Sequence, residues 1–241
     1  MAGANELITA IKLFFIVIHT AICSVFALLF IFIDRSFTLY HWLSKVFSGG
    51  ILLISGIKIK IDGLENIDPK AVYVFASNHS SQLDITALQC GIPNRLAMIF
   101  KKELAKIPLF GWQLRLGPYI MVDRKSLESA AKSIEEAKEL MKKKKISVLV
   151  FPEGTRSKTG EVQQFKRGAF HLAAKVGYPI VPVTINGTEK ILPKGTFKLK
   201  RGTIYLHIDK PIPTEYLKSK QDEVELMEKV RQIIISNKKE Y

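Results

Sequence analysis

The chain has 241 residues, of which 47% are hydrophobic and 24% are charged, and its formal net charge is +14. This length is sufficient for one domain of ordinary size with an appendage. The two cysteines, Cys23 and Cys90, are too few for a disulfide framework, which favours a reducing compartment. A basic chain could bind nucleic acid, but the sequence has no recognisable nucleic-acid-binding module. We therefore expect the positive charge to face an anionic membrane surface or a phosphate-bearing ligand.

The first 56 residues contain two apolar stretches. Residues 13–33 include no formally charged side chain, and as a helix they would be roughly 32 Å long, enough to cross the core of a bilayer. Residues 37–57 follow after three polar residues and carry Tyr40, Trp42 and Lys45, which favour the membrane interface. We predict that residues 1–56 form a helical hairpin that anchors the chain in the membrane, with both of its ends on the cytoplasmic side.

Two alternatives remain open for this N-terminal segment. The first stretch could span the bilayer and be followed by an interfacial helix, or both stretches could be buried helices of a soluble core. A cleaved signal peptide is not expected, because the apolar run is too long and no small-residue cleavage site follows it.

From residue 57 onward, short apolar runs alternate with segments of helical period. This alternation predicts an α/β fold: a largely parallel or mixed β-sheet flanked by helices and preceded by the apolar hairpin. The predicted domains are residues 1–56 for the anchor and 57–241 for the α/β domain. We predict strands at residues 57–62, 71–77, 96–100, 119–122, 146–151, 180–185 and 203–208, and helices at residues 81–90, 127–141, 165–176 and 215–236.

A histidine and an aspartate lie where a predicted strand passes into a helix, in the stretch VFASNHSSQLDITAL (residues 74–88). His79 and Asp84 are five positions apart, a turn of about 500° on a regular helix, so they would not share a helix face. They can meet only if His79 is in the loop and Asp84 is in the first helical turn. Such a pair would suit acid–base chemistry, but Asp84 could equally be the acidic member of a capping box that begins at Ser81. The residues alone leave both interpretations open.

Charged side chains follow several of the predicted strands. Lys101 and Lys102 follow one strand, Arg124 follows another, and the sequence PEGTRS, which contains Glu153 and Arg156, follows a third. Ligands of open α/β sheets bind outside the carboxyl ends of the strands, and Arg and Lys suit a phosphate group there. The sequence has neither a phosphate-binding P-loop nor a GxSxG nucleophile elbow. Its His and Cys residues are too scattered to predict a metal site.

Four blocks in this order resemble the glycerolipid acyltransferases, most closely the bacterial 1-acylglycerol-3-phosphate acyltransferases. The blocks are Asn78-His79-x4-Asp84, GPYIMVDR (residues 117–124), FPEGTRS (residues 151–157) and VPVTI (residues 181–185). The resemblance covers about residues 57–213. Four blocks in the right order are far more specific than any one of them.

The resemblance implies a membrane-bound enzyme of phospholipid synthesis in the inner cell membrane, with its catalytic domain facing the cytoplasm. It would transfer an acyl chain from an acyl-coenzyme A or acyl carrier protein thioester to the sn-2 hydroxyl of lysophosphatidate and form phosphatidic acid, without a metal or other cofactor. His79 would act as a general base whose tautomer Asp84 fixes, with no covalent intermediate, and Pro182 would shape the pocket. The residues expected to bind the acceptor phosphate are Arg124, Glu153, Gly154, Thr155, Arg156, Lys101, Lys102 and Lys166.

Two other functions fit the same residues. Ser80 or Ser81 could be a covalent nucleophile, activated by His79, in a ping-pong acyltransferase or a thioesterase. A membrane-bound lipid-binding or scaffold protein without turnover would also need an anchor and a basic domain. Trapping of an acyl-enzyme would favour the first, and transfer of a labelled acyl chain would separate an enzyme from the second.

Overall fold

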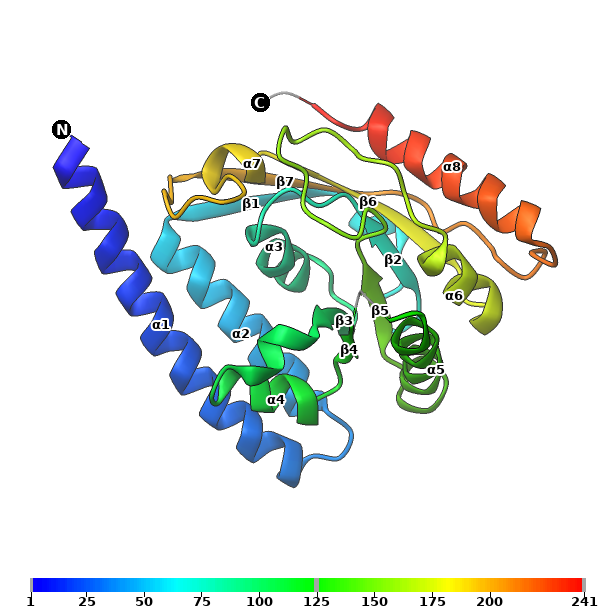
Figure 1. The fold of residues 1–241 in the computed structure, drawn as a ribbon, viewed down its shortest axis with the longest axis horizontal. Coiled ribbons are helices and arrows are strands. Elements are labelled where there is room, and N and C mark those ends of the chain that lie inside the picture. Colours follow the sequence, from blue (N-terminus) through cyan, green and yellow to red (C-terminus); the bar gives the residue numbers. More distant parts are fainter. Residues whose placement is uncertain (1, 124–125, 240–241) are drawn as a thin grey trace.

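The computed structural model describes residues 2–123 and 126–239, and it has the expected alternation of strands and helices (Figure 1). Two short 3-10 helices, η1 (Leu64–Asn66) and η2 (Lys102–Lys106), accompany the longer elements. The strands are β1 (Ile57–Asp62), β2 (Val74–Ser77), β3 (Leu96–Lys101), β4 (Ile120–Val122), β5 (Ser147–Val150), β6 (Ile180–Asn186) and β7 (Gly202–Ile208). The α-helices are α1 (Ala2–Ile33), α2 (Thr38–Ser55), α3 (Leu83–Gly91), α4 (Phe110–Leu116), α5 (Leu127–Lys144), α6 (Gly168–Val176), α7 (Thr188–Ile191) and α8 (Lys220–Ser236).

The strands form one sheet in the order β1-β7-β6-β2-β5-β3-β4 within the described residues. β6 and β7 are antiparallel, whereas the other neighbouring pairs are parallel. The prediction of a largely parallel, mixed α/β sheet is confirmed. Because β2, β3, β4 and β5 run in the same direction, the residues that follow them meet at one edge of the sheet.

Helices cover both faces of the sheet because the side chains of its central strands alternate between two apolar layers. Val74 and Ala76 of β2 belong to the layer that is covered by α5, α6 and α8. Phe75, between them, belongs to the opposite layer, which includes residues of α2 and α3. In Figure 1, α1 lies outside α2 on this second side, away from α8.

α1 and α2 form the predicted helical hairpin, joined by a short turn at residues 34–37 (Figure 1). Nζ of Lys12 donates to the backbone carbonyl of Ser55 at 2.7 Å, and Nε2 of His19 is 3.0 Å from the carbonyl of Phe47. A Cβ at Gly50 would be 2.2 Å from the His19 ring, so the close approach of the two helices requires glycine there. These contacts place the N-terminal half of α1 beside the C-terminal half of α2.

The outer face of α1 is apolar and exposed. Phe14, Phe15, Val17 and Phe32 are between 53% and 66% exposed. Within the described residues, Glu6–Ile33 is the one helical stretch that is long and apolar enough to cross a membrane, judged by length and composition.

α2 differs from α1 because it packs against the α/β domain. Tyr40, His41 and Leu52 of α2 are 2–4% exposed, and α2 contacts both α3 and β1. It therefore forms one wall of the domain as well as one arm of the hairpin. The predicted boundary at residue 56 remains a prediction.

The differences from the predicted elements have local causes. α8 begins at Lys220 because Ser219 and Asp222 form a capping box, in which each side chain accepts from the other residue's amide at 3.1 and 2.8 Å. α4 and α7 were not predicted, because helices of 7 and 4 residues are too short to show a helical period.

Candidate active site

His79 and Asp84 meet at the carboxyl end of β2, as their spacing requires. His79 lies in the loop after β2, and Asp84 is the second residue of α3. Nδ1 of His79 is 2.7 Å from Oδ2 of Asp84, which is fully buried, and His79 is 9% exposed. Because a carboxylate can only accept, Nδ1 carries the proton in this pair, and Nε2 is left as the basic nitrogen.

The same oxygen of Asp84 also organises the loop. Oδ2 accepts hydrogen bonds from the backbone amides of Ser80 and Ser81 at 2.7 and 2.8 Å. The bond from Ser81 is the acidic half of the predicted capping box, although α3 itself begins at Leu83. One carboxylate oxygen thus holds both the loop amides and the imidazole, so the two interpretations of Asp84 are compatible.

Two residues of the FPEGTRS block hold His79 from another direction. The ring of Phe151 stacks on the imidazole, with ring centroids 4.0 Å apart and an interplanar angle of 17°. Oε1 of Glu153 accepts from the backbone amide of His79 at 2.8 Å, and Oε2 accepts from Nε2 of Gln163 at 2.8 Å. Glu153 is 3% exposed, and this burial raises the pKa of its carboxyl group. Its contacts are therefore with the His79 loop, although the sequence placed it among the phosphate-binding residues.

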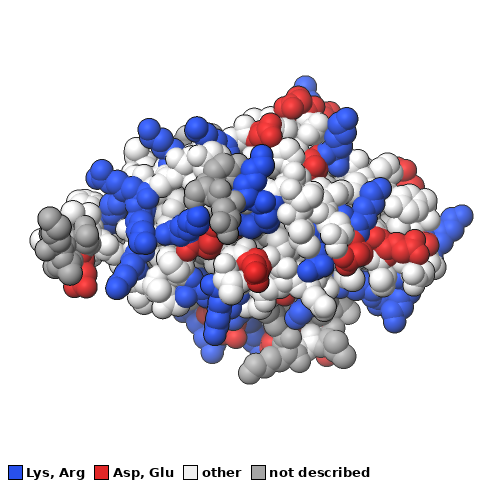
Figure 2. Space-filling model, turned by 90° about the horizontal axis from the view of Figure 1, so that it is seen from above, with Lys and Arg blue, Asp and Glu red and all other residues white. Residues whose placement is uncertain are grey.

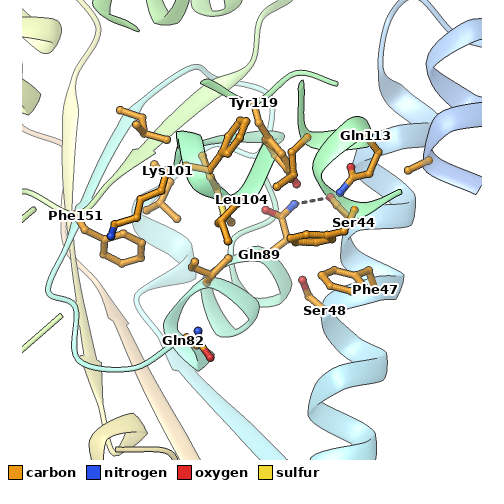
Figure 3. Close-up of a pocket in the computed structure, with 18 of the residues that line it drawn as sticks. Ser44, Phe47, Ser48, Gln82, Gln89, Lys101, Leu104, Gln113, Tyr119 and Phe151 are labelled. Atoms are coloured by element: carbon orange, nitrogen blue, oxygen red, sulfur yellow. Dashed lines mark hydrogen bonds between the residues drawn. The ribbon is translucent and has the colours of Figure 1, made fainter. Parts of the chain in front are cut away.

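His79 lines a pocket of about 410 Å³ whose walls are mostly apolar. Figure 3 shows side chains from α2, α3, the η2–α4 segment and the end of β5 converging on this pocket. The apolar lining includes Leu43 and Phe47 from α2, Ile85 from α3, and Phe110 and Leu114 from α4. Such a lining suits an alkyl chain.

Several polar side chains also face the pocket. Nε2 of Gln89 donates to Oγ of Ser44 at 2.7 Å (Figure 3), and the hydroxyl of Tyr40 donates to Oε1 of Gln113. Burial raises the pKa of Tyr119, another lining residue, to about 12, so its hydroxyl stays protonated near neutral pH. Tyr119 lies within the GPYIMVDR block, but the sequence did not mark it as a pocket residue. The other four residues belong to none of the blocks, so sequence reasoning missed them.

Cationic and hydroxyl side chains line the same pocket as His79. Lys101, Thr155 and Arg156 were expected at the site, and all three are lining residues. Lys194, which sequence reasoning missed, joins them from the loop after α7. Its Nζ donates to the carbonyl of Arg156 at 2.5 Å and lies 3.4 Å from Oγ1 of Thr155. A lysine between Pro193 and Gly195 in a loop carries no sequence signal for this role.

Of the other residues that the sequence proposed for the pocket or the phosphate, those in the described part of the chain are not among the lining residues. Lys102 is exposed and forms a 3.4 Å ion pair with Asp123, and Lys166 packs beside Gly154, whose φ of 72° favours glycine. Pro182 lies within β6, opposite Ala76 of β2, and is not among the described residues that line the pocket. Arg124 lies outside the described residues.

The site has the residues for acid–base and phosphate chemistry, and the described part of the chain holds no cluster of three His, Cys, Asp or Glu residues that could bind a metal ion. A buried His–Asp pair at an apolar pocket that cationic side chains also line is typical of an enzyme that activates a hydroxyl group on an amphiphilic substrate.

Comparison with known proteins assigns this site to a family. The family model described as Acyltransferase matches residues 58–186, which include the His79 loop, the FPEGTRS block and β6. The chain belongs to the acyltransferase family.

Curated relatives carry a more specific name. The chain is 36% identical over 205 residues to the 1-acyl-sn-glycerol-3-phosphate acyltransferase of Saccharomyces cerevisiae, in an alignment that covers 84% of this chain and 67% of the yeast protein. It is 38% identical over 209 residues to a chloroplastic 1-acyl-sn-glycerol-3-phosphate acyltransferase of Arabidopsis thaliana, covering 85% of this chain and 57% of the plant protein. The chain thus spans between about half and two thirds of the length of such relatives.

A solved structure has the same architecture over nearly the whole chain. It is the 1-acyl-sn-glycerophosphate (LPA) acyltransferase PlsC from Thermotoga maritima, with a TM-score of 0.81 and 26% sequence identity. The match covers 97% of this chain and 94% of that one, so it includes the N-terminal helices as well as the α/β domain.

Proposed function

We propose that this chain transfers an acyl chain from an acyl thioester to the sn-2 hydroxyl of 1-acylglycerol 3-phosphate and so forms phosphatidic acid for phospholipid synthesis. The observation that carries the proposal is the 2.7 Å contact between His79 and Asp84 in an apolar pocket that also contains Arg156 and Lys194. The relatives' names, which specify this acceptor, support it.

In the proposed reaction, His79 is the general base. Nε2 accepts the proton of the acceptor hydroxyl as its oxygen attacks the thioester carbonyl, while Asp84 stabilises the imidazolium through Nδ1. The new C–O bond forms, the C–S bond breaks when the tetrahedral intermediate collapses, and the imidazolium returns the proton to the departing thiolate. The thioester is a co-substrate, carried by coenzyme A or by acyl carrier protein, and no cofactor takes part.

The acceptor phosphate would be bound by the cations that line the pocket near His79. Arg156 offers bidentate hydrogen bonds, and Lys194 and Lys101 add point charges. The sequence predicts that Arg124 also binds the phosphate. Lys and Arg are also spread over the face seen in Figure 2, interspersed with acidic side chains. The chain has 36 Lys and Arg against 22 Asp and Glu, an excess that suits an anionic lipid surface.

The hydrogen bonds of the nearby serines favour direct attack by the substrate over a covalent acyl-enzyme. Oγ of Ser80 is 3.1 Å from Oγ1 of Thr188, and Oγ of Ser81 donates to the carbonyl of Leu192 at 2.8 Å. Both serines are at most 1% exposed. Neither hydroxyl is directed to His79 by these contacts, as a serine nucleophile would be.

We also place the enzyme in the inner cell membrane, anchored by the α1–α2 hairpin, with the α/β domain in the cytoplasm. The exposed apolar face of α1 supports a membrane anchor. The bond from Lys12 to Ser55 supports a hairpin, because it holds the N-terminal half of α1 next to the start of the α/β domain.

One experiment tests the function directly. The full chain is incubated with radiolabelled acyl-coenzyme A or acyl carrier protein thioester and with lysophosphatidate, glycerol 3-phosphate or lysophosphatidylcholine in turn. Of the three acceptors, we expect only lysophosphatidate to yield labelled phosphatidic acid. Transfer from either of the two donors would support the proposal. Preference for glycerol 3-phosphate or lysophosphatidylcholine would contradict the proposed acceptor, and no transfer to any of them would contradict the proposed activity.

A further inference from the structure

The segment between β3 and β4, formed by η2 and α4 (residues 102–116, the α4 segment below), has two different faces. Its inner face contributes Phe110, Gln113 and Leu114 to the pocket that contains His79. Its outer face carries Ile107, Trp112 and Leu116, which are 44%, 50% and 53% exposed. Three large apolar side chains on so short an outer face lose favourable burial unless something covers them.

The α4 segment packs against α1, which also has exposed apolar side chains. α4 contacts α1 and lies beside it in Figure 1. Cys23 and Ala27 of α1 line the same pocket as Phe110 and Leu114. α1 exposes Ile22, Phe26 and Leu29 in this part of its length. Because the two helices are in contact, their exposed apolar side chains are near enough to each other to meet the same partner.

The charges of the α4 segment specify what that partner is. Lys106 and Arg115 are exposed on the segment, together with Lys102, against a single acidic residue, Glu103. Trp beside Lys and Arg is the composition of a membrane–water interface, and the cations complement anionic headgroups. An apolar protein partner would not call for these cations.

We propose that the outer face of the α4 segment is a second membrane contact, continuous with α1, that lies at the headgroup level of an anionic bilayer. The inner face of the same segment is a wall of the pocket, so the pocket opens beside the lipid surface. An acyl chain then passes from the bilayer into the pocket along α4 without crossing bulk water. This inference goes beyond the proposed function, because contact with lipid can be measured in the absence of turnover.

Tryptophan fluorescence tests the contact on the full chain. The chain has two tryptophans, so Trp42→Phe leaves Trp112 as the reporter. With vesicles that contain anionic phosphatidylglycerol, we expect Trp112 emission to shift to the blue and to be quenched by lipids brominated near the headgroup. Vesicles that bind the protein but leave Trp112 unshifted and unquenched would overturn the proposal.

Paired substitutions test its consequence for turnover. The double variant with Ile107→Gln and Leu116→Gln is compared with Ile235→Gln, because Ile235 is 36% exposed and lies on α8, on the other side of the sheet from α1 (Figure 1). Ile107→Gln combined with Leu116→Gln should reduce turnover of bilayer-embedded lysophosphatidate about tenfold, and should not change turnover of a short-chain, water-soluble acceptor. Ile235→Gln should change neither. Equal losses with both acceptors, or no loss with either, would contradict the proposal.

Further measurements distinguish this membrane contact from a dimer interface and from the proposed function. Lys106→Gln with Arg115→Gln should weaken co-sedimentation with anionic vesicles but not with zwitterionic ones. A dimer in solution that dissociates in Ile107→Gln, with Trp112 unquenched by lipid, would assign this face to a second copy of the chain instead. Failure of acyl transfer by the wild type would defeat the proposed function, while the fluorescence of Trp112 would still decide the membrane contact.

Discussion

Oδ2 of Asp84 lies 2.7 Å from Nδ1 of His79 and accepts the amides of Ser80 and Ser81 as well. A single buried oxygen therefore links the imidazole to the backbone that carries it. This arrangement restricts both the tautomer and the position of the ring, which a general base requires before its substrate arrives.

Replacing the imidazole should remove turnover and leave the fold intact. His79→Ala should lower kcat by about 10²–10⁴-fold, the usual contribution of a general base, with lysophosphatidate binding almost unchanged. The matched control is His171→Ala, since His171 also pairs with a carboxylate, Glu223, at 2.9 Å, but lies on α6 outside the pocket. Steady-state kinetics and equilibrium lipid binding measure the effects. A His79→Ala enzyme with wild-type kcat would rule out the mechanism.

Substitutions of Asp84 separate its two roles. Asp84→Asn retains an oxygen that can accept the loop amides but cannot hold the imidazolium electrostatically, so kcat should fall while stability is largely kept. Asp84→Ala should lower kcat as well. It should also lower the free energy of unfolding by about 1–3 kcal/mol for each buried amide left without a partner. Thermal unfolding and kcat are measured on both variants. A normal rate in Asp84→Asn would mean that the carboxylate only caps the loop.

The raised pKa of Glu153 predicts a pH dependence of stability. Burial raises its pKa above the ordinary value of 4.5, so just above that pH the folded state keeps a proton that the unfolded state has released. The contribution of Glu153 to the free energy of unfolding should therefore fall as the pH rises from about 4.5 through the raised pKa. Glu153→Gln has no such proton, so the stability difference should shift in favour of the variant over this window.

Denaturant titrations of wild type and Glu153→Gln at several pH values between about 4 and 7 measure this shift. Glu161→Gln is the control, because Glu161 is an exposed carboxylate in the same loop region. Parallel pH profiles for wild type and Glu153→Gln would show that the carboxyl group has an ordinary pKa.

The cations of the pocket should act on acceptors that carry a phosphate. Arg156→Ala and Lys194→Ala should each lower kcat/KM for lysophosphatidate roughly 10–150-fold, the range for one charge-assisted hydrogen bond of about 1.5–3 kcal/mol. Arg124→Ala is expected to behave in the same way. The kcat/KM for an acceptor without the phosphate should change little in these variants. Lys158→Ala, an exposed lysine of the neighbouring loop, is the control, and equal losses with both acceptors would indicate a structural role.

The topology of the anchor can be read by labelling single cysteines with an impermeant reagent in sealed vesicles whose α/β domain faces outward. The background replaces Cys23 and Cys90 by Ala, and cysteines are introduced as Gly3→Cys, Ser36→Cys and Lys218→Cys. For the hairpin, Gly3→Cys and Lys218→Cys should label while Ser36→Cys is protected. Protection of Gly3→Cys with ready labelling of Ser36→Cys would support a single span.

Local sequence determined much of this protein. The alternation of residues 57–62 predicted β1, the apolar run of residues 13–33 predicted most of α1, and the five-residue spacing of His79 and Asp84 predicted a loop residue facing the first turn of a helix. These features depend on near neighbours in the chain, where periodicity and steric limits act directly. The order of four motif blocks was enough to indicate the family.

Only the tertiary structure decided which distant residues complete the site. Lys194 reaches the pocket from a loop after α7, Gln163 reaches Glu153 across ten positions, and Glu153 itself turns to the amide of His79 and not to the solvent. α4, too short to show a period, becomes a wall of the pocket and packs against α1. These relationships arise when the strands align at one sheet edge and the helices pack over it. Each side chain's partners are then set by contacts between segments far apart in sequence, which no local pattern encodes.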